Sequence, residues 1–369
     1  KAEGSHITDT EGKKYIDLIS GISVSNVGHC HPKVVAAIKA QVDRYMHVMV
    51  YGEYIQSPQV KLAEKIASLL PPTLNCSYFT NSGAEAIEGA MKLAKRITGR
   101  AEIISFENAY HGSTQGALSI MGSEFFKTSF RPLLPGTKRL RFNHAEDLSQ
   151  ITEETACVFA EPVQGEAGAI PAQEGFLEKL RKRCDETGAL LVFDEIQTGF
   201  GRTGKLFGYM HSGVIPDVIV FAKGMGGGLP IGAFVSSREN LSAFTENPVL
   251  GHITTFGGNP VCCAAALATV NAIVEENLVA GVAEREAVIS AILGKSGEIH
   301  LRGKGLLYAA VLANAEKVQR VIQHCLQHGV ITDWFLFCDN ALRIAPPLNI
   351  PLNDLNYSCE VIRDGVNRF

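Results

Sequence analysis

The chain is 369 residues long, which is too many for one ordinary hydrophobic core and suits about two domains. Its composition is that of a globular protein, with 46% apolar and 20% charged residues. The net charge of −4 gives no basis for binding nucleic acid, which usually needs a basic face. No apolar run approaches the roughly 20 residues that span a bilayer. We therefore expect neither nucleic acid nor a membrane among its partners.

Nine cysteines are scattered along the chain, and no two of them form a CxxC pair. An odd number without such pairs argues against both a disulfide framework and a zinc ribbon. The first residues are polar and do not have the pattern of a signal peptide. We therefore expect reduced, mostly buried thiols in a cytoplasmic protein.

Hydrophobic periodicity predicts an α/β protein. The opening segment predicts a hairpin, with strands at 5–8 and 14–17 around a turn. The middle of the chain then alternates between strands at 77–80, 102–106, 156–160, 189–193 and 217–221 and helices that include 84–98 and 175–187. Strands and helices in alternation predict a mainly parallel sheet that helices cover on both faces.

The character of the sequence changes after about residue 259, where a long helical pattern runs through 261–276. Shorter strands and helices follow to the end of the chain. We expect a large domain from 26 to 260 and a smaller α+β domain from 261 to 369. The segment 1–25 is expected to pack with the small domain.

Polar residues follow three of the predicted strands, and ligands in a parallel α/β sheet gather at the carboxyl ends of its strands. After the first of these strands, Ser82 and Glu85 fit a capping box that starts a helix. Gly83 between them lets the backbone approach a ligand, and free amides at a helix start attract phosphate. From these residues alone, a plain helix start and a phosphate site are both open.

An acid and a lysine follow two further strands. Asp194 comes directly after a buried strand, where it either holds a proton on a heterocyclic nitrogen or caps a helix, and Gln197 donates to a nearby oxygen. Lys223 follows the apolar strand 217–221, where partial burial lowers the pKa of an amine and favours imine formation. The alternative is a lysine whose head reaches solvent. The glycines after Lys223 do not fit GxGxxG, so we expect no nucleotide site.

Taken together, these motifs resemble the class III aminotransferases, which belong to the fold type I pyridoxal-phosphate enzymes. The resemblance covers nearly the whole chain and includes relatives that act on acetylornithine, ornithine, putrescine and 4-aminobutyrate. The motifs that carry it, in chain order, are Gly28–Pro32, Asn81–Ala86, Tyr110–Gly112, Glu161–Glu166, Phe193–Gly204, Ala222–Gly224, Thr254–Pro260 and Leu342–Leu348. It implies a large domain with a mainly parallel sheet and a smaller α+β domain.

The resemblance also implies roles for residues of a pyridoxal 5'-phosphate site. Lys223 would form a Schiff base with the cofactor and, once substrate displaces it, act as general acid and base. Asp194 would keep the ring nitrogen protonated, and Gln197 would contact the ring hydroxyl oxygen. The remaining cofactor residues would be Gly83 and Ala84 at the phosphate, Tyr110 and Ile196 on the two ring faces, His111 and Glu161 beside them, and Thr255 at the phosphate of the neighbouring subunit. A homodimer with shared active sites would be the smallest active unit.

Two residues resemble the family's substrate-binding pair. Arg343 would bind a substrate α-carboxylate through two-point pairing, and Glu166 would mask that arginine when the substrate end lacks a carboxylate. This pair suits an ω-amino donor, either an amino acid or a diamine, and an α-keto acid acceptor such as 2-oxoglutarate or pyruvate. Members that act on acetylornithine or ornithine typically carry Arg after His-Gly, whereas this chain has Ser113 there.

Alternative functions stay open on the sequence. The same fold supports pyridoxal-phosphate aminomutases and decarboxylases, which need no stoichiometric amino acceptor. A binding protein without turnover is a third possibility, against which the retention of Lys223, Asp194 and Gln197 argues. We expect no metal site at 29–31, because the resemblance places this segment at a turn before the helix that begins at Lys33. We also expect none at His324 and His328, because no third ligand completes an evident motif.

Overall fold

The computed structural model describes residues 1–369 and contains a seven-stranded sheet. The strands of this sheet, in spatial order, are β4 (Cys76–Thr80), β12 (Gly232–Ser236), β11 (Val218–Phe221), β10 (Leu190–Asp194), β7 (Thr155–Ala160), β5 (Glu102–Phe106) and β6 (Thr137–Leu140). β12 is antiparallel to both of its neighbours, and the other pairs are parallel. The predicted α/β class with a mainly parallel sheet is therefore confirmed.

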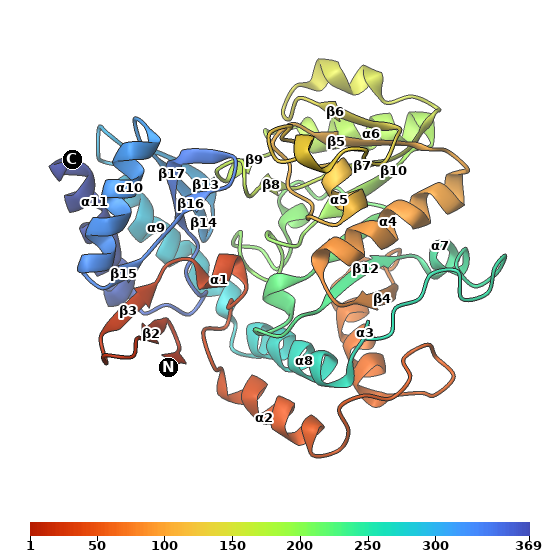
Figure 1. The fold of residues 1–369 in the computed structure, drawn as a ribbon, viewed down its shortest axis with the longest axis horizontal. Helices are drawn as coiled ribbons and strands as arrows, with labels where there is room; N and C mark the ends of the chain where they lie inside the picture. The colour runs from red at the N-terminus through yellow and green to blue at the C-terminus, as the bar shows by residue number, and fades with distance from the viewer.

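Helices cover both faces of this sheet, as Figure 1 shows. α4 (Gly83–Thr98) packs on one face, and α6 (Phe176–Thr187) packs on the other. Side chains of β11 alternate between the two faces of the sheet. Val218 and Val220 join the core beneath α4, whereas Ile219 and Phe221 join the core that contains α6. The strand is apolar throughout because both of its faces are buried.

The second part of the molecule is built on a four-stranded antiparallel sheet. Its strands are β13 (His300–Lys304), β14 (Leu307–Val311), β17 (Cys338–Ile344) and β16 (Trp334–Phe335), and its helices are α9 (Val282–Leu293), α10 (Ala315–Gln327) and α11 (Leu352–Arg368). The helices enclose their own core with this sheet. β16 and β17 form the hairpin that approaches the larger sheet.

The N-terminal segment lies beside this second part, where red and blue ribbons meet in Figure 1. The predicted hairpin is confirmed as β2 (His6–Thr8) and β3 (Lys14–Asp17). β1 (Ala2–Glu3) extends it on one side, and β15 (Val330–Ile331) pairs with β3 on the other. The division at residues 26 and 260 stays a prediction.

The remaining elements connect or cover these sheets. They are α1 (Ser20–Ser23), α2 (Pro32–Val42), α3 (Ser57–Leu69), α5 (Gln115–Ser119), α7 (Arg238–Ser242), α8 (Pro260–Glu275), β8 (Val163–Gln164), β9 (Ile170–Pro171) and short 3-10 turns such as η4 (Lys223–Met225). α8 packs against α2 and α3, beside the larger sheet. No single helix has the length and hydropathy of a membrane span; only Pro260–Glu275 and Leu278–Leu293 meet that test as a pair, with a bend of 60° between them.

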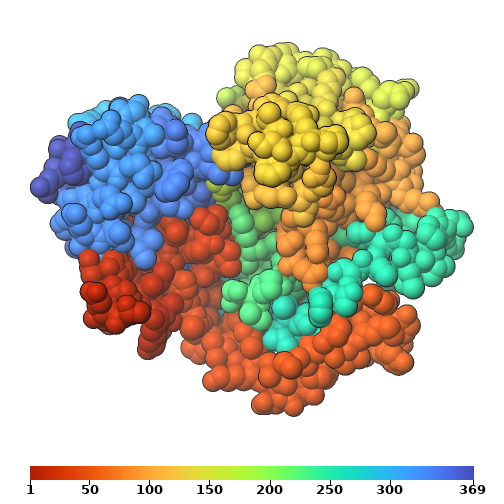
Figure 2. All heavy atoms as spheres, viewed as in Figure 1, coloured from red at the N-terminus to blue at the C-terminus, as the bar shows by residue number.

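The carboxyl ends of β4, β10 and β11 lie at the same edge of the large sheet, facing the second part of the molecule. Figure 2 shows a hollow between the blue C-terminal part and the yellow and orange part, with green atoms from the middle of the chain at its floor. The polar motifs that follow these strands are thereby brought to one place.

Candidate active site

A cavity of about 420 Å³ lies at this edge of the sheet. The predicted site residues that line it are Gly83, Ala84, Tyr110, His111, Glu161, Asp194, Ile196, Gln197 and Lys223. Glu166 and Arg343 line a second cavity of about 350 Å³, which shares Tyr110 and Lys223 with the first. Thr255 lines neither cavity and is exposed. One connected site therefore contains all the predicted residues except Thr255.

Lys223 lies at the end of β11, where the chain leaves the sheet into η4. Its φ of 41° falls in the left-handed region, which is strained for a residue with a side chain. Nζ makes no hydrogen bond, and burial lowers the pKa of this amine from its ordinary value. An unpaired amine with a lowered pKa between two cavities has the properties of an imine-forming nucleophile.

Asp194 ends β10 and is held by two hydrogen bonds. Its Oδ1 accepts the backbone amide of Ile196 at 2.9 Å, and its Oδ2 lies 2.7 Å from Nδ1 of His111. Burial alone lowers the pKa of His111, but the hydrogen bond and charge of Asp194 outweigh burial, and the pKa is raised overall. Nε2 of His111 is buried without a partner. The imidazole thus fixes the orientation of the Asp194 carboxylate.

The start of α4 forms the opposite wall of the first cavity. One half of the predicted capping box is present, because Oγ of Ser82 accepts the amide of Glu85 at 3.2 Å. The Glu85 carboxylate accepts the amide of Asn81 at 2.8 Å instead of that of Ser82. The first amides of the helix, at Gly83 and Ala84, have no acceptor within the helix. They line the cavity, where the helix dipole favours an anion.

Gly112 lets the next loop approach this helix start. Its φ is 128°, and a Cβ there would lie 2.7 Å from Cβ of Ala84 and 3.1 Å from its Cα. A side chain at this position would therefore push the loop away from α4. The small residue keeps Tyr110 and His111 at the cavity wall.

Glu161 is a buried carboxyl group that contacts two backbone amides. Oε1 accepts the amide of Tyr110 at 3.2 Å, and Oε2 accepts that of Gly165 at 2.9 Å. Burial raises the pKa of Glu161 to about 7, although the charge of His111 opposes the shift. The side chain therefore joins the loop of Tyr110 to the loop that carries Glu166.

Arg343 on β17 forms a two-point ion pair with Glu166. Nη1 and Nη2 each donate to one carboxylate oxygen at 2.9 Å, and both side chains are buried. Burial tends to raise the pKa of Glu166, but the hydrogen bonds and charge of Arg343 dominate and lower it to about 2. Gln197 contacts both partners at 3.3 Å, so this pair is linked to the first cavity.

This ion pair predicts an acid-sensitive contribution to stability. The folded pKa of Glu166 is about 2, below the unfolded value of roughly 4.3, so the contribution is present above pH ~4.3 and is lost as the pH falls toward 2. We expect wild type to lose roughly 2–3 kcal/mol more unfolding free energy than Glu166→Gln between pH 5 and 2. Urea unfolding at several pH values measures this difference. Parallel pH profiles for the two proteins would contradict it.

Two contacts within the site were not predicted from the sequence. His111 was expected beside the pocket without its pairing to Asp194, and Asp333 was not expected there. Oδ1 of Asp333 accepts from Nε of Arg343 at 2.9 Å, so the guanidinium has two carboxylate partners. Asp333 lies in the two-residue connection between the short strands β15 and β16, and this position after a strand was the available signal.

Two histidine groups considered as metal ligands make other contacts. Nε2 of His29 lies 2.7 Å from Oδ2 of Asp17. The rings of His324 and His328 lie 4.2 Å apart, and Nδ1 of His328 contacts the carbonyl oxygen of His324. No group of three His, Cys, Asp or Glu side chains has an arrangement that could hold a metal ion.

The family model described as aminotransferase class-III matches residues 1–366. The chain is a class-III aminotransferase. It is 39% identical over 367 residues to the acetylornithine aminotransferase of Methanopyrus kandleri, which covers 99% of this chain and 92% of that protein. It is 40% identical over 370 residues to the acetylornithine aminotransferase of Methanosarcina mazei, covering 99% and 90% respectively.

Solved structures agree with this membership. A transaminase from the marine bacterium Virgibacillus superposes with a TM-score of 0.94 at 32% identity, over 100% of this chain and 92% of that one. The ornithine aminotransferase of Toxoplasma gondii gives a TM-score of 0.93 at 27% identity, over 100% and 90%. This aminotransferase uses pyridoxal phosphate, as its family does. The mutase, decarboxylase and binding-protein alternatives are not favoured.

Proposed function

We propose that this aminotransferase transfers the amino group of an ω-amino donor to an α-keto acid such as 2-oxoglutarate or pyruvate, with Lys223 as the residue that binds the cofactor. The observation that carries the proposal is the unpaired Lys223 amine, which lies between the cavity of Asp194 and the cavity of Arg343. One side of the amine suits a cofactor, and the other suits a substrate.

The residues of the first cavity fit pyridoxal phosphate. The amides at Gly83 and Ala84 would hold its phosphate, and Asp194 would hold the proton of its ring nitrogen. Tyr110 and Ile196 would lie against the ring faces, and Gln197 would lie near the ring hydroxyl. The His111 pair supports this assignment, since it holds the Asp194 carboxylate in a fixed orientation.

Bound pyridoxal phosphate supplies an electron sink that acidifies the carbon bearing the transferred nitrogen. Lys223 takes up and returns the proton at that carbon, a role for which an amine of lowered pKa is suited. Asp194 stabilises the positive charge on the ring nitrogen. Asp194 is buried, and the low local polarity strengthens its electrostatic effect.

Arg343 and Glu166 serve the two halves of the reaction in this proposal. With the ion pair closed, no guanidinium edge is free, which suits a donor whose reacting end lacks a carboxylate. When the keto acid enters, its α-carboxylate replaces Glu166 on the same two donors. The geometry supports this exchange because Glu166 occupies Nη1 and Nη2, which form one edge of the guanidinium.

A homodimer with Thr255 reaching the partner's cofactor phosphate completes the proposal. Exposed apolar side chains near Thr255 in sequence support a covered face, among them Val249 (72% exposed) and Phe256 (57%). Ile55 is 90% exposed on another loop. We also propose a cytoplasmic location, for which the nine free cysteines are the support.

N-acetylornithine is the second candidate donor, because the relatives above carry the name acetylornithine aminotransferase. Ser113 argues against it, since its hydroxyl gives no charge for a donor carboxylate. Oγ of Ser113 lies 3.2 Å from the hydroxyl of Tyr110, so the position adds a neutral contact to the cavity wall.

The test is the visible absorption spectrum of the purified protein, first alone and then with single amines in the absence of keto acid. We expect a yellow protein whose visible band is bleached stoichiometrically by an ω-amine donor and restored by 2-oxoglutarate or pyruvate. A protein that cannot be loaded with pyridoxal phosphate, or a band that persists with every amine, would refute the proposed function.

A further inference from the structure

The second cavity adjoins the reacting amine and has a defined lining. Its residues are Ile22, Tyr110, Glu166, Lys223, Asp333, Trp334, Leu336 and Arg343. Lys223 and Tyr110 also line the cofactor cavity, so a donor amine at Lys223 extends its chain into this second space. The residues that line this cavity therefore determine which chemical group the donor can carry at the end opposite its reacting amine.

The cations of this cavity have no free donor for a carboxylate at that far end. Nε of Arg343 donates to Asp333, while Nη1 and Nη2 both donate to Glu166. Nη2 also reaches the carbonyl oxygen of Trp334 at 3.2 Å. Lys223 is engaged by the reaction itself. Two carboxylates thus face one guanidinium, and no donor of that guanidinium is left for a carboxylate of the ligand.

Asp333 has an unused acceptor. Its Oδ1 bonds to Arg343, but its Oδ2 makes no hydrogen bond, and the side chain remains 24% exposed at the cavity wall. Glu166 differs, because both of its oxygens accept hydrogen bonds. Oδ2 of Asp333 is therefore the carboxylate oxygen that a ligand can reach.

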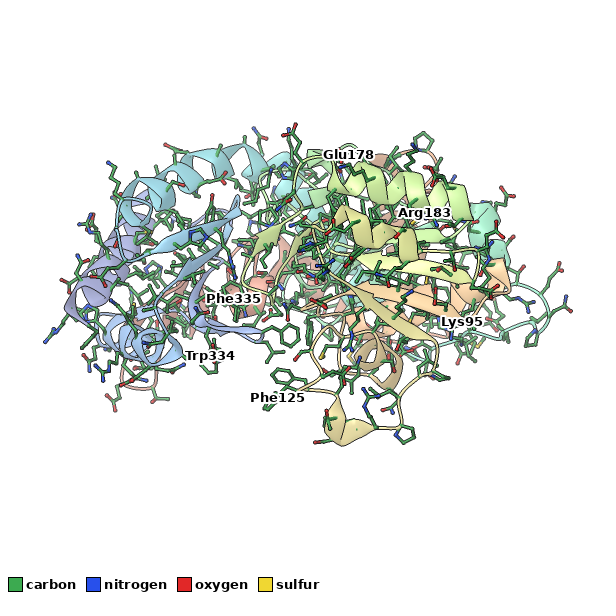
Figure 3. All side chains as sticks on the ribbon, turned by 90° about the horizontal axis from the view of Figure 1, so that it is seen from above. Lys95, Phe125, Glu178, Arg183, Trp334 and Phe335 are labelled. Atoms are coloured by element: carbon green, nitrogen blue, oxygen red, sulfur yellow. The ribbon has the colours of Figure 1, made fainter.

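The remaining walls suit a chain of methylenes that ends in a cation. Ile22 and Leu336 offer apolar surface, and Trp334, which is 47% exposed, also lines the cavity and adjoins Asp333 in the chain. An ammonium group is attracted both to a carboxylate and to the face of an aromatic ring. Figure 3 shows Trp334 and Phe335 at the edge of the C-terminal sheet, with Phe125 opposite them.

We propose that Asp333 is a specificity-determining residue that binds a distal ammonium of the amine donor through Oδ2 while Oδ1 holds Arg343. This inference rests on the proposed function and narrows its donor to diamines. A donor with a distal carboxylate is disfavoured by Asp333 and Glu166, and a monoamine leaves Oδ2 without a partner.

The Asp333 carboxylate is expected to weaken binding of the keto acid, whereas it strengthens binding of the diamine. When Glu166 leaves Arg343, Asp333 remains on Nε and partly offsets the charge that attracts the α-carboxylate. Asp333→Asn keeps an oxygen that can accept from Nε but removes the negative charge. The substitution is therefore expected to weaken diamine binding and to strengthen keto-acid binding.

The experiment compares three amines of equal length, 1,5-diaminopentane, 5-aminopentanoate and pentylamine, as donors that bleach the holoenzyme. We expect wild type to prefer the diamine to pentylamine by at least about tenfold in kcat/KM, as for a hydrogen bond to a charged group. Asp333→Asn is expected to remove most of this preference and to lower the KM for 2-oxoglutarate or pyruvate a fewfold. Asp339→Asn is the matched control, because Asp339 is exposed on β17 outside both cavities.

The outcomes separate this inference from the function on which it rests. Asp333 has only a structural role, and the inference is wrong, if Asp333→Asn lowers kcat/KM equally for all three amines. The same conclusion follows if the substitution raises the KM for the keto acid together with the KM for the diamine. Preference of wild type for 5-aminopentanoate would also overturn it, while the aminotransferase proposal would stand. Failure of every amine to bleach the wild-type band would instead refute the proposed function and the inference with it.

Discussion

Lys223→Ala is expected to abolish turnover, lowering kcat by at least about four orders of magnitude, while the protein keeps its fold. In the proposed function, the lost amine is both the covalent attachment point and the proton carrier, and proton transfer by a positioned side chain alone contributes up to ~10⁴-fold. Steady-state assays with an amine donor and keto acid measure the loss, and the visible band of the loaded protein is expected to disappear.

The fold of this variant is expected to persist because Nζ of Lys223 makes no hydrogen bond that the substitution would break. Its thermal unfolding midpoint, measured without cofactor, should stay within a few degrees of wild type. Lys205→Ala is the control, since Lys205 is an exposed lysine on the loop before β11 and lies outside both cavities. Near-full activity of Lys223→Ala would refute the assignment of this lysine.

Replacing Arg343 is expected to separate the two halves of the reaction. Arg343→Ala should raise the KM for the keto acid by about 100-fold, because two charge-assisted hydrogen bonds to the α-carboxylate are lost. The rate with a diamine donor should fall much less, since the donor half-reaction needs no free guanidinium edge. Single-turnover bleaching by the diamine and recovery with the keto acid measure the two effects separately.

Stability is a second readout for Arg343, because the alanine variant leaves Glu166 buried without its partner. Removing one member of a buried pair costs about 3–5 kcal/mol. Arg343→Lys retains the positive charge but lacks the planar fork, so it should fold and still raise the KM for the keto acid. Arg320→Ala replaces an exposed arginine of α10 as control. Equal losses in both half-reactions for Arg343→Lys would contradict the proposed role.

The fold class and the polar strand ends could be predicted from the sequence because both depend on local patterns. Apolar runs such as β11 have to be buried on both faces, and alternation with helices produces a parallel sheet. The hydrogen bond from the amide of Glu85 to Oγ of Ser82 spans only three residues, and the structure contains it. Lys223 and Asp194 follow two such strands, so their approach to one edge follows from the topology.

The contacts that tune the site could not be predicted, because they join residues far apart in sequence. His111 and Asp194 are 83 residues apart, and Glu166 and Arg343 are 177 apart. Their distances depend on how β17 and its hairpin pack against the large sheet, which no local pattern specifies. The placement of Arg343 beside Glu166 was expected only through the family resemblance.

The sequence by itself determined an α/β protein with a lysine and an acid at the carboxyl ends of neighbouring strands, since strand periodicity and chain order decide both. Only the tertiary structure decided that Asp333 shares Arg343 with Glu166 and keeps one oxygen free at the cavity wall. The physical reason is that the charge of a cavity is a sum over side chains from separate elements. That sum exists only once packing has brought them together.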